Sequence, residues 1–440
     1  MDKGRDLKPD FSPARGERVL IALSGGADSV ALAVMLSDAR EEYGLTLFAA
    51  HVDHGIRPES AEDAAFCKAL CARLDIPFMT VRLDVPEEAR RQRRGLEAVA
   101  RELRYRALRQ FKDETRSNFI ALAHHMDDQA ETVLMHLARG AGPRGISGMR
   151  ALSGDLYRPL LGYRKSELTA YLEARGFGWR EDRTNRVADN PRNALRLNAI
   201  PALEACYPQF VRAASRYAYS AGIEDELLEG LTGEWLAANR GEGPLCAWLD
   251  VAAPPHRAIL RRALKSLLPD ALSWEQLNAI EALCARGRGR IDVSDALFVE
   301  RAGCRLYVVR KDRPPTDPAP LSSNGKTDFG PFCAIDAAPS PPIPVRDDPF
   351  TQVLNARALD GAVVRTRRDG DRIRPLGCCD KLLSDYFIDK KVDRPLRDGI
   401  PLVAKGDRIL WVCGMGIAEE AAVRPNDATI RLECKITQIH

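Results

Sequence analysis

The sequence predicts an α/β protein with an N-terminal doubly wound parallel sheet, followed by a mainly helical domain and a small α+β C-terminal domain. Up to about residue 165, short apolar runs alternate with helical patterns, which is typical of a parallel sheet with helices on both faces. Residues from about 215 to 285 carry helical patterns, and a compact segment from about 350 to 440 is rich in short strand patterns.

These patterns divide the 440 residues into five segments. We expect a flexible tail at 1–17, a catalytic domain at 18–215, a mainly helical domain at 216–311, a linker at 312–348 and an α+β domain at 349–440. The linker is expected because its stretch is rich in proline, glycine and serine.

Composition limits the class of protein. No apolar run approaches the ~18 residues of a membrane span, and the charged start MDKGRDLKPD does not resemble a signal peptide. We therefore expect a cytoplasmic protein with no membrane partner. The net charge of +3 does not by itself indicate a nucleic-acid partner. The 11 cysteines form no CxxC pair, so neither a disulfide framework nor a zinc site is predicted.

Four strands are expected in the first domain, at RVLIAL (18–23), LTLFAAHVD (45–53), PFMTVRL (77–83) and NFIALAHH (118–125). Ligands of open α/β sheets bind at the carboxyl ends of the strands. His51 and Asp53 stand at such an end and project to the same side, because side chains alternate along a strand. Satisfied polar packing is the alternative interpretation of this pair.

The segment GLEAVARELRYRALRQF predicts a helix with one apolar stripe and one basic face. Arg101 and Arg104 lie on the basic face, and Arg192 and Arg196 lie further along in NPRNALR. An arginine fork matches two phosphate oxygens at once, so these four side chains are candidate phosphate contacts. Ordinary surface charge is the alternative for each of them.

The stretch IALSGGADSVAL (21–32) predicts a strand, a glycine turn and a helix. Gly25 and Gly26 allow close approach of the backbone to an anion, and Ser24 and Ser29 add hydroxyl donors. The loop lacks the lysine of a Walker loop and carries Asp28 instead, which suits a polyphosphate that brings Mg²⁺. A bare SGG turn would be equally compatible with a simple connection.

The complete SGGxDS pattern resembles the PP-loop pyrophosphatases, which split ATP between its α and β phosphates. Further stretches extend the resemblance to the tRNA(Ile)-lysidine synthetases over nearly the whole chain, namely AHVDHGIRPESAED, GLEAVARELRYRAL, ALAHHMDDQAETVLMHLARG, YRPLLGYRKSEL, WREDRTNRVADNPRNALRLNAIPAL and VVRTRRDGDRIRPLG. This resemblance implies a PP-loop fold and a ligase that uses ATP, free lysine and tRNA. It also implies that lysine is joined to C2 of an anticodon cytidine through an adenylated intermediate, with AMP and pyrophosphate released.

Asp128 and Glu131 are three residues apart on an expected helix and so face the same way. In a crevice they could hold Mg²⁺ or steer and deprotonate an incoming ammonium, since the lysine amine has a pKa of ~10.4 and reacts only when neutral. A solvated face is the alternative. The resemblance supports the crevice and implies catalytic roles for Asp28, Asp128, Glu131, Arg104 and Arg196, with Mg²⁺ at Asp28 and Asp128.

A basic run in the C-terminal segment is expected to bind the RNA phosphates. It contains Arg365, Arg367, Arg368, Arg372 and Arg374, with Lys381 following. The chain departs here from the family, which often carries several lysines where this chain has only Lys381. The sequence does not determine the oligomeric state and is compatible with a homodimer.

Two other functions are compatible with the sequence. A PP-loop tRNA thiolase would activate the same kind of base but deliver sulfur, and such enzymes commonly use paired cysteines, which this chain lacks. The second alternative is a non-catalytic protein that binds RNA in a nucleotide-dependent way. The GAGPRG stretch at 140–145 matches GxGxxG formally, but it follows an expected helix and indicates a flexible lip rather than a dinucleotide site.

Overall fold

The computed structural model describes residues 7–55, 60–180, 191–243, 245–268, 272–311, 317–330, 332–342 and 348–436. The chain divides into two compact units, Met1–Leu227 and Leu228–His440, and each is described by itself. None of the helices in these ranges is long and apolar enough to cross a membrane.

The first unit is built on a six-stranded sheet with the strand order β3-β2-β1-β4-β6-β5. Its elements are η1 (Ser12–Ala14), β1 (Arg18–Ala22), α1 (Ala27–Asp38), α2 (Arg40–Tyr43), β2 (Thr46–Asp53), α3 (Ser60–Arg73), β3 (Phe78–Arg82), α4 (Val85–Gln92), α5 (Leu96–Glu114), β4 (Phe119–Ala121), α6 (Met126–Ala138), α7 (Pro143–Ile146), β5 (Leu152–Ser153), β6 (Leu156–Tyr157), α8 (Lys165–Ala174), α9 (Pro191–Ala194), η3 (Leu195–Ala199), α10 (Ile200–Cys206) and the first part of α11 (Phe210–Asn239), whose residues after Leu227 belong to the second unit. All neighbouring strands pair in parallel except β5 and β6, which are antiparallel.

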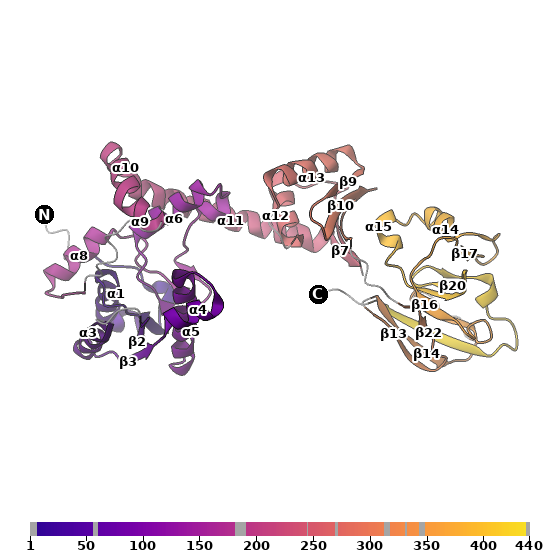
Figure 1. Cartoon of the computed structure of the whole chain (residues 1–440), viewed down its shortest axis with the longest axis horizontal. Helices are drawn as coiled ribbons and strands as arrows, with labels where there is room; N and C mark the ends of the chain where they lie inside the picture. Colours follow the sequence, from indigo (N-terminus) through magenta and orange to yellow (C-terminus); the bar gives the residue numbers. More distant parts are fainter. Residues whose placement is uncertain are drawn as a thin grey trace. The chain divides into compact units, whose positions relative to one another are not determined.

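Helices cover both faces of this sheet, as the sequence predicted (Figure 1). Val19 and Ile21 of β1 pack into one core cluster with residues of α1, α3 and α8. Leu20, between them, packs on the other face with Leu108 of α5. This alternation follows from the two-residue period of a strand, and it confirms the doubly wound arrangement.

The expected flexible tail at 1–17 was wrong for its later part. Residues 1–6 lie outside the described residues, but Phe11 and Ala14 are buried in the core of the first unit. The Tyr157 hydroxyl donates a hydrogen bond to the carbonyl oxygen of Asp10 at 2.9 Å. These contacts hold the later part of the segment against the first unit.

The second unit contains the expected helices and more strands than expected. Its elements are β7 (Arg240–Gly243), β8 (Cys246–Asp250), α12 (Arg257–Leu267), α13 (Trp274–Arg286), β9 (Gly289–Asp292), β10 (Leu297–Ala302), β11 (Arg305–Arg310), β12 (Ala319–Pro320), β13 (Gly325–Phe329), β14 (Cys333–Pro339), β15 (Thr351–Asn355), β16 (Val363–Arg365), β17 (Arg372–Ile373), β18 (Lys381–Leu382), α14 (Leu383–Asp389), α15 (Arg394–Arg397), β19 (Leu402–Lys405), β20 (Arg408–Val412), β21 (Gly416–Ile417), η4 (Glu419–Ala421) and β22 (Thr429–Ile436). The helices α12 and α13 pack on the antiparallel sheet β7-β8-β11-β10-β9.

The expected linker at 312–348 was also wrong in its middle. Residues 312–316, 331 and 343–347 lie outside the described residues, but β12, β13 and β14 form within this stretch. β14 pairs with β22 in the four-stranded sheet β13-β14-β22-β15. Phe329 and Ile335 of this sheet share a core cluster with Trp411 of β20, which belongs to a separate seven-stranded sheet. The stretch is therefore part of the C-terminal α+β fold, whose class the sequence predicted correctly.

Candidate active site

The glycine turn between β1 and α1 has the geometry of an anion cradle. Gly25 has φ of +88°, a backbone conformation that favours glycine, and a Cβ there would lie 3.4 Å from Cys67 Sγ. The Ser29 hydroxyl accepts a hydrogen bond from the Ser24 amide at 3.2 Å and donates one to the Gly26 carbonyl at 3.0 Å. The turn leads directly into the first amides of α1, where an anion is stabilised.

A cavity of about 440 Å³ opens beside this turn, at the carboxyl ends of β1, β2 and β4. Its lining includes the predicted site residues Ser24, Gly26, Asp28, Ser29, His51, Asp53 and Arg104, together with His54, Asp63 and His124. β1 lies between β2 and β4 in the sheet, so the connections turn away in opposite directions at this point. Such a switch point is where open α/β sheets bind ligands.

Four buried polar atoms of the cavity lining have no hydrogen-bond partner among the described residues. They are Asp28 Oδ1, His54 Nδ1, Arg104 Nε and His124 Nδ1. An unsatisfied buried polar group costs roughly 1–3 kcal/mol, and native proteins rarely carry several together. The lining is therefore suited to a polar ligand.

His51 and Asp53 both line the cavity, and both have local partners. His51 Nδ1 lies 2.9 Å from the Leu23 carbonyl oxygen, and the Gly55 amide donates to Asp53 Oδ1 at 2.8 Å. Arg82 Nε lies 3.7 Å from Asp53 Oδ2. The two side chains help to hold the strand ends in place, and their contact with nucleotide stays a prediction.

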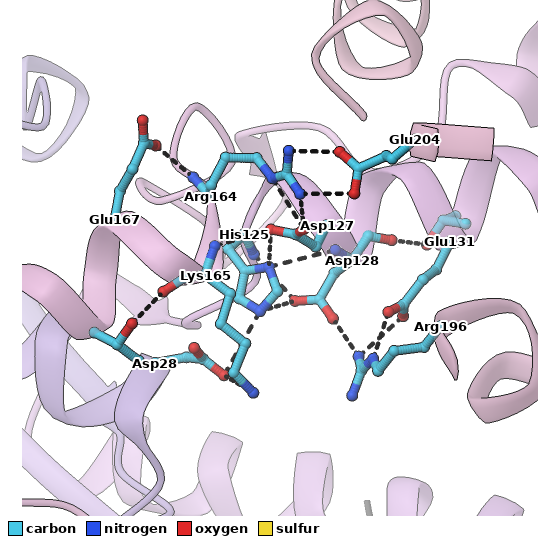
Figure 2. Close-up of polar contacts among 12 residues, drawn as sticks. Asp28, His125, Asp127, Asp128, Glu131, Arg164, Lys165, Glu167, Arg196 and Glu204 are labelled. Atoms are coloured by element: carbon cyan, nitrogen blue, oxygen red, sulfur yellow. Dashed lines mark hydrogen bonds and ion pairs between the residues drawn. The ribbon is translucent and has the colours of Figure 1, made fainter. Parts of the chain in front are cut away.

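Asp28 is connected to the start of α6 through His125, a residue that the sequence reasoning did not select (Figure 2). His125 Nε2 lies 3.6 Å from Asp28 Oδ2 and 3.5 Å from Asp128 Oδ2. Burial by itself would lower the pKa of His125, but the contact with Asp28 and the charges of Asp128 and Asp127 raise it above its ordinary value. Burial would raise the pKa of Asp28, but the contact with His125 and the charges of His125, Lys165 and Arg196 outweigh it and hold this pKa below its ordinary value.

Asp128 and Glu131 lie on one side of α6 and are buried, and both pair with arginines, of which Figure 2 shows Arg196. Arg192 Nε donates to Glu131 Oε2 at 2.7 Å, and Arg196 Nε donates to Glu131 Oε1 at 2.5 Å. Both arginines also donate to Asp128 Oδ1 at 3.1 Å. The carboxylates expected to receive an ammonium therefore pair here with the arginines expected to contact phosphate.

A second ion-pair group at the start of α8 was not singled out from the sequence. Arg164 binds Asp127 at 2.9 Å and Glu204 at 2.9 Å, which ties α6, α8 and α10 together. The next residue, Lys165, donates its amide to Asp127 at 2.8 Å and places Nζ 3.8 Å from Asp28 Oδ2. The stretch YRKSEL was part of the family resemblance, but nothing in its pattern indicated that Lys165 meets the glycine turn.

The fit of Mg²⁺ differs between the two acids predicted to hold it. The described residues contain no group of three or more His, Cys, Asp or Glu side chains suited to a metal ion. Asp28 has one buried oxygen without a partner, which fits an ion that also takes phosphate oxygens and water. Asp128 uses Oδ1 for two arginines and Oδ2 for the His125 amide, so it fits poorly in this arrangement.

The predicted RNA contacts of the C-terminal part fall into three kinds. Arg365 is 2% exposed and pairs with buried Asp371, so the expectation that it binds RNA was wrong. Arg367, Arg372 and Lys381 make ion pairs with Asp398, Asp380 and Asp389. Arg368 is exposed, and its side chain makes no ion pair with another described residue.

The cysteines near the site do not support sulfur chemistry. Cys67 and Cys71 are buried in α3, and burial raises the pKa of each thiol to about 12. A thiol must ionise to act as a nucleophile. The GAGPRG stretch follows α6 and leads into the short α7, so the strand that a dinucleotide fingerprint requires is absent before it.

Comparisons with known proteins agree with this geometry. A family model described as PP-loop domain matches residues 3–203, and one described as TilS substrate C-terminal domain matches residues 362–434. The tRNA(Ile)-lysidine synthase of Geobacter sulfurreducens is 33% identical over 93% of this chain and 91% of its own length. The enzyme of that name from Thermus thermophilus is 35% identical over 90% of this chain and 69% of its own, and that from Symbiobacterium thermophilum is 33% identical over 96% and 94%. The chain belongs to the tRNA(Ile)-lysidine synthase family.

Proposed function

We propose that this chain joins the side-chain amine of free lysine to C2 of a cytidine in the anticodon of tRNA(Ile), with ATP cleaved to AMP and pyrophosphate. The observation that carries the proposal is the set of four unpartnered polar atoms in the cavity beside the SGGADS turn. Family membership supports the choice of tRNA as substrate, and the proposal extends it to lysine, to Mg²⁺ and to residue roles.

In the first step, the cytidine O2 attacks the α phosphate of ATP and pyrophosphate leaves. The amides after Gly25 and the Ser24 and Ser29 hydroxyls would hold this leaving group, because donors aimed at developing charge lower a barrier most effectively. Asp28 would hold Mg²⁺ with the phosphate oxygens, and Mg²⁺ would neutralise phosphate charge there. Arg104 lines the same cavity and would stabilise the α phosphate.

In the second step, the lysine amine displaces AMP from C2. Glu131 and Asp128 are the carboxylates that would bind the ammonium and accept its proton, since only the neutral amine attacks. Arg196 and Arg192 would be free for phosphate or RNA once they leave these carboxylates.

The test is an assay of tRNA, ATP, Mg²⁺ and labelled lysine, read by mass spectrometry of the tRNA and by nucleotide analysis. Asp28→Asn should reduce tRNA-dependent AMP formation on the order of 100-fold or more. Asp38→Asn, at the other end of α1 with a side chain 45% exposed, is the matched control and should retain activity. Glu131→Gln should lose more of the amine transfer than of the adenylation.

Two results would reject the proposal. Formation of ADP and orthophosphate would mean that the turn serves γ-phosphoryl transfer. Binding of ATP and tRNA without AMP formation would instead indicate a non-catalytic, nucleotide-dependent RNA-binding protein.

A further inference from the structure

Three arginines gather around Tyr105, and we call Arg101, Arg104, Tyr105 and Arg158 the Tyr105 cluster. Arg104 is the member that lines the cavity. The guanidinium carbons of Arg101 and Arg104 lie 5.0 and 5.4 Å from the centre of the Tyr105 ring. Arg158 follows β6 directly and is only 8% exposed. Nothing in the sequence reasoning selected Tyr105 or Arg158.

The cluster holds several donors without acceptors. Arg158 Nη1 donates to the Arg150 carbonyl oxygen at 3.0 Å, but Arg158 Nε has no partner within the described residues. The same holds for Arg104 Nε and for the Tyr105 hydroxyl. No ion pair joins Arg101, Arg104 or Arg158 to a carboxylate of the described chain, in contrast to Arg192 and Arg196.

An anion would relieve this arrangement. A buried charge without a counter-charge is costly, and like charges nearby add repulsion. Burial lowers the pKa of both Arg104 and Arg158, and the charge of Arg101 lowers each further, although the contact with Tyr105 opposes the shift. Planar guanidinium forks match the oxygen pairs of a phosphate group, which is the anion that such a set of donors fits best.

The cluster lies apart from the glycine turn. In the sheet, β6 is next to β4, and β4 is next to β1, so Arg158 is two strands away from the turn, which corresponds to about 10 Å at ~4.8 Å per strand. Arg104 and the neighbouring His124 line the cavity that the turn also lines. The cavity therefore has an anion cradle beside Asp28, and Arg104 is the member of the Tyr105 cluster that lines it.

We propose that Arg101, Tyr105 and Arg158 of the Tyr105 cluster bind a phosphodiester of the RNA that adjoins the nucleotide entering the cavity, while Arg104 serves the α phosphate of ATP. The glycine turn and Asp28 already provide for the phosphates of ATP. The cluster runs from buried Arg158 to exposed Arg101, as needed for a polymer that must leave the site on the solvent side. The identity of the polyanion rests on the proposed function, whereas the anion site itself rests on the geometry.

The test compares an anticodon stem-loop that has ordinary phosphodiesters with one that has neutral methylphosphonates on both sides of the target cytidine. Wild-type protein should bind the neutral version about tenfold more weakly, the size of one lost charge-assisted contact. Arg158→Gln should bind the ordinary version about tenfold more weakly and discriminate less than twofold between the two. Its affinity for ATP with Mg²⁺ should stay within twofold of wild type.

Arg109→Gln is the matched control, because Arg109 lies on the same helix as Arg101 and Arg104, with a 56% exposed side chain that pairs with Asp155. It should keep the wild-type discrimination. If Arg158→Gln fails to fold in a thermal melt, Arg101→Gln and Tyr105→Phe take its place, with discrimination expected to fall in both.

The inference is overturned if Arg158→Gln still loses tenfold on the neutral linkages, or if it weakens ATP and leaves RNA binding unchanged. The second pattern would assign the cluster to a nucleotide phosphate. These binding measurements need neither lysine nor turnover, so a protein that binds the stem-loop in this way but forms no lysidine would reject the proposed function and keep the cluster.

Discussion

Replacing Arg365 with glutamine should destabilise the second unit strongly. The guanidinium donates to both oxygens of Asp371, at 2.8 and 2.7 Å, and to the carbonyl oxygens of Thr366 at 3.0 Å and Gly406 at 2.8 Å. The two side chains of the pair are 3% and 2% exposed. Removing one partner of a buried ion pair costs about 3–5 kcal/mol because the other charge stays buried. In a unit of the size of Leu228–His440, 1 kcal/mol corresponds to ~2–4 °C, so the melting temperature should fall by at least about 6 °C.

The assay is thermal unfolding of the full chain followed by calorimetry, with tRNA binding measured at a temperature where the variant is still folded. Arg368→Gln is the control, because Arg368 lies three residues away and is exposed. It should melt within about 2 °C of wild type and bind tRNA more weakly. The reasoning fails if Arg365→Gln melts like wild type and instead loses affinity for tRNA, since Arg365 would then be an RNA contact.

Three further predictions concern other parts of the chain. Gly25→Ala forces a side chain into a φ of +88°, at a cost of roughly 1–2 kcal/mol, and should lower both the melting temperature and ATP affinity in a titration. Burial lowers the pKa of His124 to about 4, below the ~6.5 of an unfolded chain, so the unfolded state binds more protons in that window. Stability should therefore fall as the pH falls from about 6.5 to 4, and His124→Asn should flatten the melting temperature over that range. Iodoacetamide should label exposed Cys378 and Cys379 in the native chain and spare Cys67, and labelling of Cys67 in peptide mass spectrometry would favour the thiolase alternative.

The glycine turn and the strand ends could be predicted because their chemistry is local. Gly25, Asp28 and Ser29 lie within a short stretch after one strand, and the turn needs glycine whatever surrounds it. His51 and Asp53 needed only the alternation of a strand and the rule that ligands sit at carboxyl ends. The structure places Asp28, Ser29, His51 and Asp53 around one cavity.

The partners of charged side chains could not be predicted, because they depend on contacts distant in sequence. Arg365 and Arg368 look alike in RTRRDGD, yet one is buried against Asp371 and the other is exposed. Arg158 stands in RPLL without any periodic signal, and its burial depends on the position of β6 in the sheet. Strands within the proline-rich stretch were missed for the same reason, since β14 is stabilised by pairing with β22, about a hundred residues away.

The charge balance at α6 constrains how an amine can enter the site. Glu131 is fully buried, and both of its oxygens accept hydrogen bonds from Arg192 and Arg196. A lysine ammonium can reach Glu131 only by displacing a guanidinium, because the carboxylate has no free oxygen and no open face. The displaced arginine keeps its charge and is stabilised only where an anion is near. Amine binding therefore costs less once a phosphate of the activated nucleotide is present to receive that guanidinium than it does in the free protein.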